Sequence, residues 1–177
     1  MSNGNTRRRA FLGIAASASA ISAPQSRKAP MKLVIGADHA GFPMKDPVVK
    51  LLRSWGHPVK DCGTFSTEPV DFPDIARKVT DEILSGAAER GILVCGTGVG
   101  ACIAGNKVRG IRAALCHDTY SARQCVEHDD VNLICVGAWI IGIKLAEEIL
   151  KAYLNATFST DEEFRRRVRK LQEMEKR

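Results

Sequence analysis

Several common functional signatures are missing from this sequence of 177 residues, and each absence narrows what the protein can be. The six cysteines form no Cys-x-x-Cys pair and have no His spacing suited to zinc, so neither a metal site nor a disulfide framework is expected. No apolar run is long enough to span a bilayer stably, so no membrane anchor is expected. The chain lacks the Lys-Ser/Thr of a P-loop and the Gly-x-Gly-x-x-Gly of a dinucleotide fold, which argues against any nucleotide cofactor.

Net positive charge is nearly absent beyond the first thirty residues. The formal net charge is +6, and five positive charges unbalanced by any acid are Arg7, Arg8, Arg9, Arg27 and Lys28. The rest of the chain is close to neutral, so it has no basic tract that could follow a phosphate backbone. A nucleic-acid partner is therefore not expected.

Residues 1–30 are typical of a targeting segment. A twin arginine lies within residues 6–12, and a short run rich in Ala, Ser and Gly follows at 11–23. This pattern resembles a twin-arginine export signal, which predicts a leader over 1–30 and a periplasmic or otherwise exported protein. The alternative is that Met31 is the true start, in which case the protein is cytoplasmic.

From residue 31 to 177 the pattern predicts one α/β domain, because short apolar runs alternate with amphipathic segments. A Rossmann-like, five-stranded parallel sheet with helices on both faces is expected. A C-terminal helix is expected at about 160–177, with Thr160 as N-cap and Glu163 completing a capping box. The expected strands are 32–37, 58–61, 91–95, 112–116 and 132–137, and the other helices are 39–55, 74–85, 99–107, 119–128 and 142–153.

Polar residues and glycines follow several of the expected strands. In parallel sheets, ligands bind beyond the carboxyl ends of the strands, where the strand order reverses. This rule selects Asp38 with His39, the loop 95–100, the pair 117–118 and the segment 137–139. Asp38 and His39 could orient a hydroxylated ligand, or Asp38 could simply be a helix N-cap.

The loop Cys95-Gly-Thr-Gly-Val-Gly100 carries the most specific chemical prediction. Its alternate glycines allow backbone N–H groups to converge on a small anion or oxyanion at the start of the next helix. The same amides would favour the thiolate of Cys95. The alternative is a tight strand-to-helix turn with a buried cysteine. His128 lies at the end of an expected helix, next to Asp129. The C-terminus of that helix and the Asp129 carboxylate would each favour a protonated imidazole. The alternative is that His128 has no function, as is common for an exposed histidine at a helix end.

A set of motifs, in order along the chain, resembles the type B ribose-5-phosphate isomerase family, which includes the galactose-6-phosphate isomerase subunits. The resemblance implies a metal-free and cofactor-free aldose–ketose isomerase that acts through a cis-enediolate on a small sugar. It also implies a homodimer, or a dimer of dimers, with shared active sites. The motifs are Met31–Gly41, Asp71–Pro73, Cys95–Gly100, Ala104–Lys107, Gly110–Ala113, Tyr120–Ala122 and His128–Asn132.

The resemblance also implies roles for individual residues. Cys95 matches the base that moves the substrate proton between C1 and C2, and His128 matches the residue that opens the sugar ring. Asp38 and His39 match residues that contact the sugar. The candidates to hold the O1 and O2 oxygens are Thr97 and the amides of Gly96, Gly98 and Gly100. Asp129 is a further substrate-binding candidate, at a position where many members have an Asn that helps to stabilise the enediolate; a carboxylate there would repel the developing oxyanion unless it is protonated or turned away.

Three positions depart from the family pattern. Trp139 stands where the family has a phosphate-binding arginine, and Glu163 stands one helical turn before Arg167, the one terminal-helix arginine that matches. Asp129 replaces an Asn found in many members. An indole suits the apolar face of a sugar, so the expected substrate is a non-phosphorylated pentose or hexose outside the cytoplasm. The alternatives are a retained ribose 5-phosphate or other sugar-phosphate isomerase, and a non-catalytic sugar-binding protein.

Overall fold

The computed structural model describes Met1 and residues 29–176, and its centre is a five-stranded sheet in which every neighbouring pair is parallel. The strand order is β2-β1-β3-β5-β4, which confirms the predicted fold class. Strand β4 is shorter than expected, because the amide of Arg112 bonds to the side chain of Asn132 (2.9 Å) instead of entering the ladder. The strands are β1 (Leu33–Ala37), β2 (Val59–Asp61), β3 (Arg90–Cys95), β4 (Ala113–Leu115) and β5 (Leu133–Gly137).

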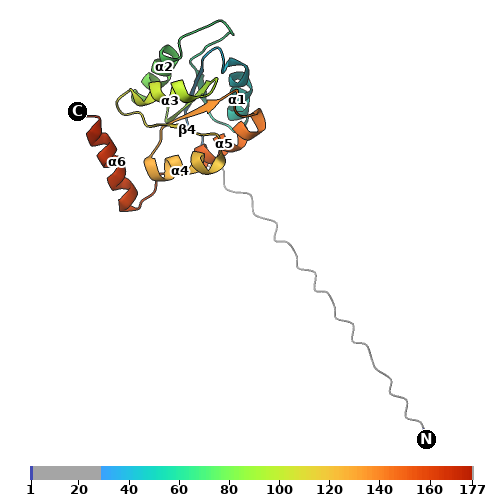
Figure 1. Ribbon diagram of the computed structural model, residues 1–177, viewed down its shortest axis with the longest axis vertical. Helices are drawn as coiled ribbons and strands as arrows, with labels where there is room; N and C mark the ends of the chain where they lie inside the picture. Colours follow the sequence, from blue (N-terminus) through green and yellow to red (C-terminus); the bar gives the residue numbers. More distant parts are fainter. Residues whose placement is uncertain (2–28, 177) are drawn as a thin grey trace.

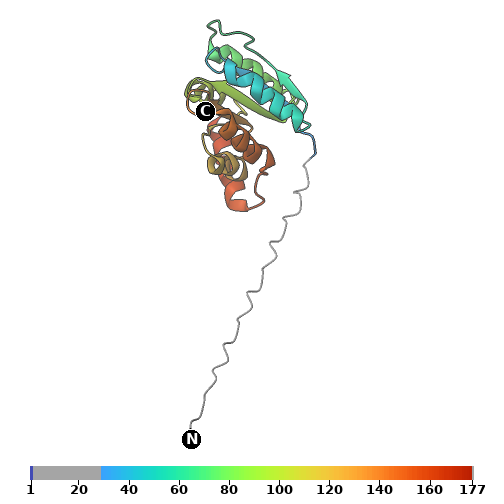
Figure 2. The same cartoon turned by 90° about the vertical axis from the view of Figure 1, so that its right-hand side faces the viewer.

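Helices cover both faces of the sheet, as predicted (Figures 1 and 2). One face packs against α2 and α3, and the other packs against α1, α4 and α5. The helices are α1 (Phe42–Ser54), α2 (Phe72–Leu84), α3 (Val99–Asn106), α4 (Thr119–Asp129), α5 (Ile143–Asn155) and α6 (Glu162–Met174).

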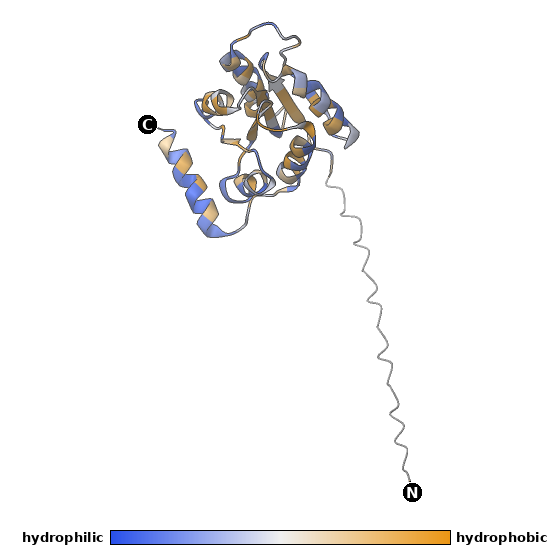
Figure 3. Ribbon diagram, turned by 45° about the vertical axis from the view of Figure 1, so that its right-hand side comes forward, coloured by the Kyte–Doolittle hydropathy of each residue, from blue (hydrophilic) through white to orange (hydrophobic). Residues whose placement is uncertain are grey.

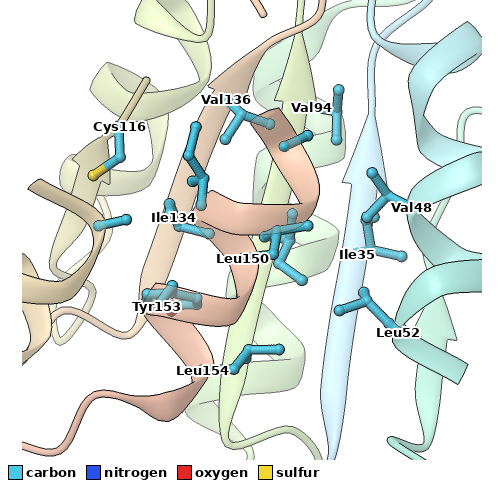
Figure 4. Close-up of a cluster of buried hydrophobic side chains, with 14 of the residues drawn as sticks. Ile35, Val48, Leu52, Val94, Cys116, Ile134, Val136, Leu150, Tyr153 and Leu154 are labelled. Carbon is cyan, nitrogen blue, oxygen red and sulfur yellow. The ribbon is translucent and has the colours of Figure 1, made fainter. Parts of the chain in front are cut away.

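The core explains why the strands are almost continuously apolar (Figure 3). On one face, Val48 of α1 and Leu150 of α5 are fully buried against Ile35, Val94 and Ile134 of the three central strands (Figure 4). Burial of each such side chain contributes roughly 1.5–3 kcal/mol. Because both faces are covered in this way, only the two ends of the strands are left for polar chemistry.

Helix α1 begins later than its periodicity predicts. Met44, Val48 and Leu52 lie four residues apart and so face the sheet together. The chain before them forms a turn, in which Asp38 Oδ1 accepts a hydrogen bond from the Gly41 amide at 2.8 Å. The helix then starts at Phe42 with Gly41 as its N-cap, so the alternative role of Asp38 as the N-cap is wrong.

Helix α6 lies apart from the sheet and packs against α4 (Figure 1). It begins at Glu162 with Asp161 as N-cap, and no side chain caps it, so the predicted capping box at Thr160 is wrong. The Asp161 amide instead bonds to Ser159 Oγ at 3.0 Å, which places the turn one residue later. Val168 is the buried residue of this largely charged helix.

The predicted export leader, residues 1–30, lies almost entirely outside the described residues. Among the helices that the structure describes, none is long and apolar enough to cross a membrane.

Candidate active site

The carboxyl ends of β1 and β3 lie side by side and bring Asp38 into contact with Cys95. Ala37 pairs with Val94 in the parallel ladder, so the residues that follow these two strands are neighbours. The Cys95 thiol donates to Asp38 Oδ2 with a sulfur–oxygen distance of 2.8 Å. Both side chains are buried, at 8% and 7% exposure. A buried thiol and a buried carboxylate in direct contact form a reactive pair in which one proton can be shared.

The glycine loop turns from β3 directly into α3. Gly98 is the N-cap of α3 and has a left-handed backbone (φ 80°), which favours glycine. Thr97 is exposed, and its Oγ1 accepts a hydrogen bond from the Val99 amide at 3.4 Å. The first turn of α3, including Gly100, therefore directs backbone N–H groups toward the space beside Cys95. This arrangement can stabilise negative charge that develops on a bound oxygen.

The protonation of Cys95 differs from the sequence-based expectation. Burial raises the pKa of the Cys95 thiol, and the hydrogen bond to Asp38 raises it further. The amides of Gly98 and Gly96 lower the pKa, as expected, but they do not outweigh the other two effects. The predicted effect of the loop amides on the thiolate is therefore present, but burial and the neighbouring carboxylate, which the prediction left out, outweigh it.

Trp139 lies directly on the glycine loop. The amides of Ala138 and Trp139 donate to the carbonyls of Cys95 (2.8 Å) and Gly96 (3.0 Å), which extends the β3–β5 pairing beyond the strands. The ring of Trp139 covers Gly96 so closely that an added Cβ there would meet ring carbons at 2.9 Å. The Trp139 side chain is nonetheless 73% exposed. A flat apolar surface is therefore presented to solvent next to the Cys95–Asp38 pair.

His39 lies at the same edge of the sheet, half-buried, and its Nδ1 accepts a hydrogen bond from the Val70 amide at 3.3 Å. His117 follows β4, and its Nε2 accepts a hydrogen bond from the Gly137 amide at 3.0 Å, which fixes the turn that carries Trp139. The strand-end rule had selected all of these positions.

Two residues that support this edge were missed from the sequence. A Cβ on Gly41 would lie 2.1 Å from the Val94 carbonyl oxygen, so glycine is required where α1 begins beside β3. Lys45 is fully buried on α1, where it pairs with Asp61 at the end of β2. The sequence does contain a signal for this pair, because Lys45 occupies a core-facing position of an amphipathic helix. A lysine is almost never fully buried unless it is paired, so this position predicts an acidic partner.

His128, Asp129 and Arg167 form a second group, away from Cys95. Helix α4 runs antiparallel to the strands, so its last residues lie at the opposite end of the sheet from the glycine loop. The His128 ring stacks on Phe164 of α6 (centroids 3.9 Å apart), and the Arg167 guanidinium lies 5.5 Å from the same ring. Glu163 pairs with Arg167 at 3.6 Å.

Of these three residues, Asp129 helps to line a groove of about 620 Å³ between α6 and the edge of the sheet. A single chain therefore brings Asp38, His39, Thr97, Trp139 and the loop glycines to Cys95, but it does not bring His128, Asp129 or Arg167 there. Within the described part of the chain, no group of three or more His, Cys, Asp or Glu side chains could hold a metal ion.

Comparison with known proteins gives consistent results. Residues 33–171 match the model of a family described as Ribose/Galactose Isomerase. The chain is 42% identical over 127 residues to ribose-5-phosphate isomerase B of Escherichia coli, and the matched region covers 72% of this chain and 85% of that protein. It is 40% identical over 137 residues to 4-deoxy-4-sulfo-D-erythrose isomerase of a Clostridium species, with 76% and 86% covered. Among solved structures, ribose-5-phosphate isomerase B of Clostridium thermocellum matches with a TM-score of 0.81 and 43% identity, over 82% of this chain and 98% of that one.

Proposed function

The chain belongs to the ribose/galactose isomerase family, and we propose that it interconverts an aldose and a ketose through a cis-enediolate formed beside Cys95. The observation that carries this proposal is the Cys95 thiol, held against Asp38 at the head of a loop of backbone amides. Proton removal next to a carbonyl needs a positioned base and donors for the oxyanion that forms. Cys95 supplies the base, while Thr97 and the loop amides supply the donors.

We propose that the substrate is a short sugar with a terminal anionic group. The names of two relatives support this choice, since one acts on ribose 5-phosphate and the other on a sulfonated erythrose. An exposed arginine cluster on α6, which includes Arg167, could bind such an anion.

A non-phosphorylated pentose or hexose is the second candidate. One observation favours it: the exposed indole of Trp139 lies on the glycine loop, at the position where the family resemblance leads us to expect a cation. An aromatic face beside the reacting carbons suits the apolar side of an uncharged sugar. In this candidate the isomerase chemistry at Cys95 is unchanged and only the recognition of the distal end of the sugar differs.

We propose that the active site is completed by a second copy of the chain. His128 and Arg167 lie with α4 and α6, at the end of the sheet opposite Cys95, so they cannot act on a sugar bound at Cys95 of their own chain. In a homodimer, or a dimer of dimers, α4 and α6 of one protomer would bring His128 and Arg167 to the glycine loop of its partner. His128 would then open the sugar ring.

A substrate panel with purified protein tests the proposed activity. Each free pentose, hexose and tetrose is paired with its phosphate ester, and conversion is followed by NMR. We expect isomerisation of a phosphate ester well above that of its free sugar, and loss of turnover in Cys95→Ala. Preference for a free sugar would select the second candidate. Sugar binding without conversion by the wild-type protein would instead make it a non-catalytic binding protein.

Export of the protein through a twin-arginine leader in residues 1–30 remains a proposal. Arg8 and Arg9 and the short apolar run after them support it. Expression of the full chain, followed by N-terminal sequencing of the protein from each cell fraction, tests it. A protein that begins at Met1 or Met31 and stays in the cytoplasm would contradict it.

A further inference from the structure

Asp38 is the side-chain hydrogen-bond partner of the Cys95 thiol, beside the backbone amides of Gly96 and Gly98. Asp38 Oδ2 accepts from the thiol at 2.8 Å, and Asp38 Oδ1 accepts from the Gly41 amide at 2.8 Å. Both oxygens of Asp38 therefore already have partners before any sugar binds. The Gly41 amide orients the carboxylate, and Gly41 packs so closely on β3 that an added Cβ would lie 2.1 Å from the Val94 carbonyl oxygen.

We propose that Asp38 is the group that takes the proton from the Cys95 thiol, so that the two side chains act as a catalytic dyad with one shared proton. This inference rests on the proposed isomerase activity and goes beyond the sugar-contacting role that the family resemblance implies for Asp38. A residue that only binds a sugar hydroxyl needs to face the sugar, whereas Asp38 uses one oxygen to hold the sulfur and the other to hold its own turn.

The proton steps balance within the dyad and the sugar. The thiol proton moves to Asp38 Oδ2, and the thiolate then removes the proton from C2 of the aldose. The C2–H electron pair forms the C1–C2 double bond, while the carbonyl π electrons move to O1. The proton on O2 passes to O1, the carbonyl forms at C2, and the new thiol delivers its proton to C1. The thiolate finally recovers the proton from Asp38, so no outside reagent is consumed.

The electrostatics of the site agree with this assignment. Burial and the neighbouring carboxylate raise the pKa of Cys95, so loss of its proton to solvent is unfavourable at neutral pH. A thiolate with a raised pKa is also a stronger base toward carbon. Other groups near the sulfur do not replace Asp38: the Cys135 thiol of β5 is fully buried, and the His39 ring bonds to Val70.

The pH dependence of turnover tests the dyad. In the wild type, kcat/KM should vary little across the neutral range, because the thiol proton moves internally. In Asp38→Asn the thiol must lose its proton to solvent, so kcat/KM should rise about tenfold per pH unit below the thiol pKa. At pH 7 its kcat should fall on the order of 10²- to 10⁴-fold. Asp38→Glu, which keeps a carboxylate, should keep the flat profile, and Asp81→Asn on the exposed surface of α2 is the matched control.

Alkylation by iodoacetamide provides an independent measurement on the same variants. If Asp38 takes the thiol proton, its loss in Asp38→Asn should slow alkylation of Cys95 at pH 7 as well as isomerisation, and the alkylation rate of the variant should then rise about tenfold per pH unit below the thiol pKa. The tryptic peptide from Gly91 to Lys107 also contains Cys102, so fragment-ion mass spectrometry must resolve the two sites.

Slower isomerisation and slower alkylation in Asp38→Asn, both rising with pH, would support the dyad, whereas faster alkylation would show that Asp38 only repels the thiolate and would overturn it. A higher KM with unchanged kcat, an unchanged pH profile and an unchanged alkylation rate would overturn it and leave Asp38 as a sugar contact. If no sugar is isomerised by the wild type, the proposed function fails, yet slower and more strongly pH-dependent alkylation in Asp38→Asn would still support proton coupling between Asp38 and Cys95. Circular dichroism melting of each variant separates these outcomes from misfolding.

Discussion

Replacement of Trp139 by arginine should change which sugars the protein accepts. The Trp139 side chain is 73% exposed, and its backbone amide holds the turn through the Gly96 carbonyl at 3.0 Å. That bond does not depend on the side chain, so Trp139→Arg should keep the turn and the fold. The new guanidinium would extend from the glycine loop toward the distal end of a sugar bound at Cys95.

The size of the effect follows from the chemistry of one new charge-assisted contact. A hydrogen bond between a guanidinium and a phosphate contributes about 1.5–3 kcal/mol when the ligand excludes water, which corresponds to a factor of about 10 to 150. We therefore expect kcat/KM for the phosphate ester to rise by about this factor. A free sugar gains no charge contact and loses the indole face, so its kcat/KM should stay equal or fall.

The assay is the ratio of kcat/KM for a sugar phosphate to that for the matching free sugar, measured for both proteins. Ile140→Arg is the matched control, because it adds the same charge to the same turn at a residue that is also exposed (55%). If both variants change the ratio equally, the effect is one of net charge and the assignment of Trp139 to the substrate site is wrong. A ratio unchanged in Trp139→Arg would refute it as well.

Two further predictions concern stability. Gly41→Ala should lower the free energy of unfolding by about 3 kcal/mol or more, because its Cβ would collide with the backbone oxygen of Val94; Gly142→Ala, where a Cβ meets no atom within 4 Å, should cost no more than about 1 kcal/mol in the same urea titration. Burial raises the pKa of the Cys135 thiol, so the unfolded chain ionises first. Its contribution to stability is thus complete at neutral pH and is lost progressively as pH rises from about 8, through the unfolded thiol pKa and toward the raised folded pKa. Urea titrations across that range should show a smaller decline in Cys135→Ala than in the wild type, and equal slopes would contradict the assigned burial effect.

The sheet was predictable because strands that are buried on both faces have continuous runs of apolar residues in the sequence. Val34, Leu93 and Ile134 lie in apolar runs with glycine or polar residues at their ends, and the structure places all of them in central strands. Boundaries were less predictable, because side chains distant in sequence decide them. Asn132 delays the start of β4 by bonding to Arg112, and no local pattern marks that bond.

The candidate site was predictable to the extent that it depends on strand ends. The parallel sheet brings Asp38, Cys95 and Trp139 together, and each was selected from its place after a strand. The protonation of Cys95 was not predictable in this way, because it depends on a carboxylate 57 residues away and on burial by the whole fold. The separation of His128 from Cys95 follows from the direction of α4 relative to the strands. The position of the end of α4 relative to the glycine loop is defined only when the sheet has formed.

That separation has a genetic consequence if the sites are shared between two chains. A protomer that lacks Cys95 still carries an intact His128, and a protomer that lacks His128 still carries an intact Cys95. When the two defective chains pair, one of the shared sites receives both lesions and the other receives none. Alleles that are inactive alone would therefore complement each other in one cell, as alleles of a single-chain active site would not.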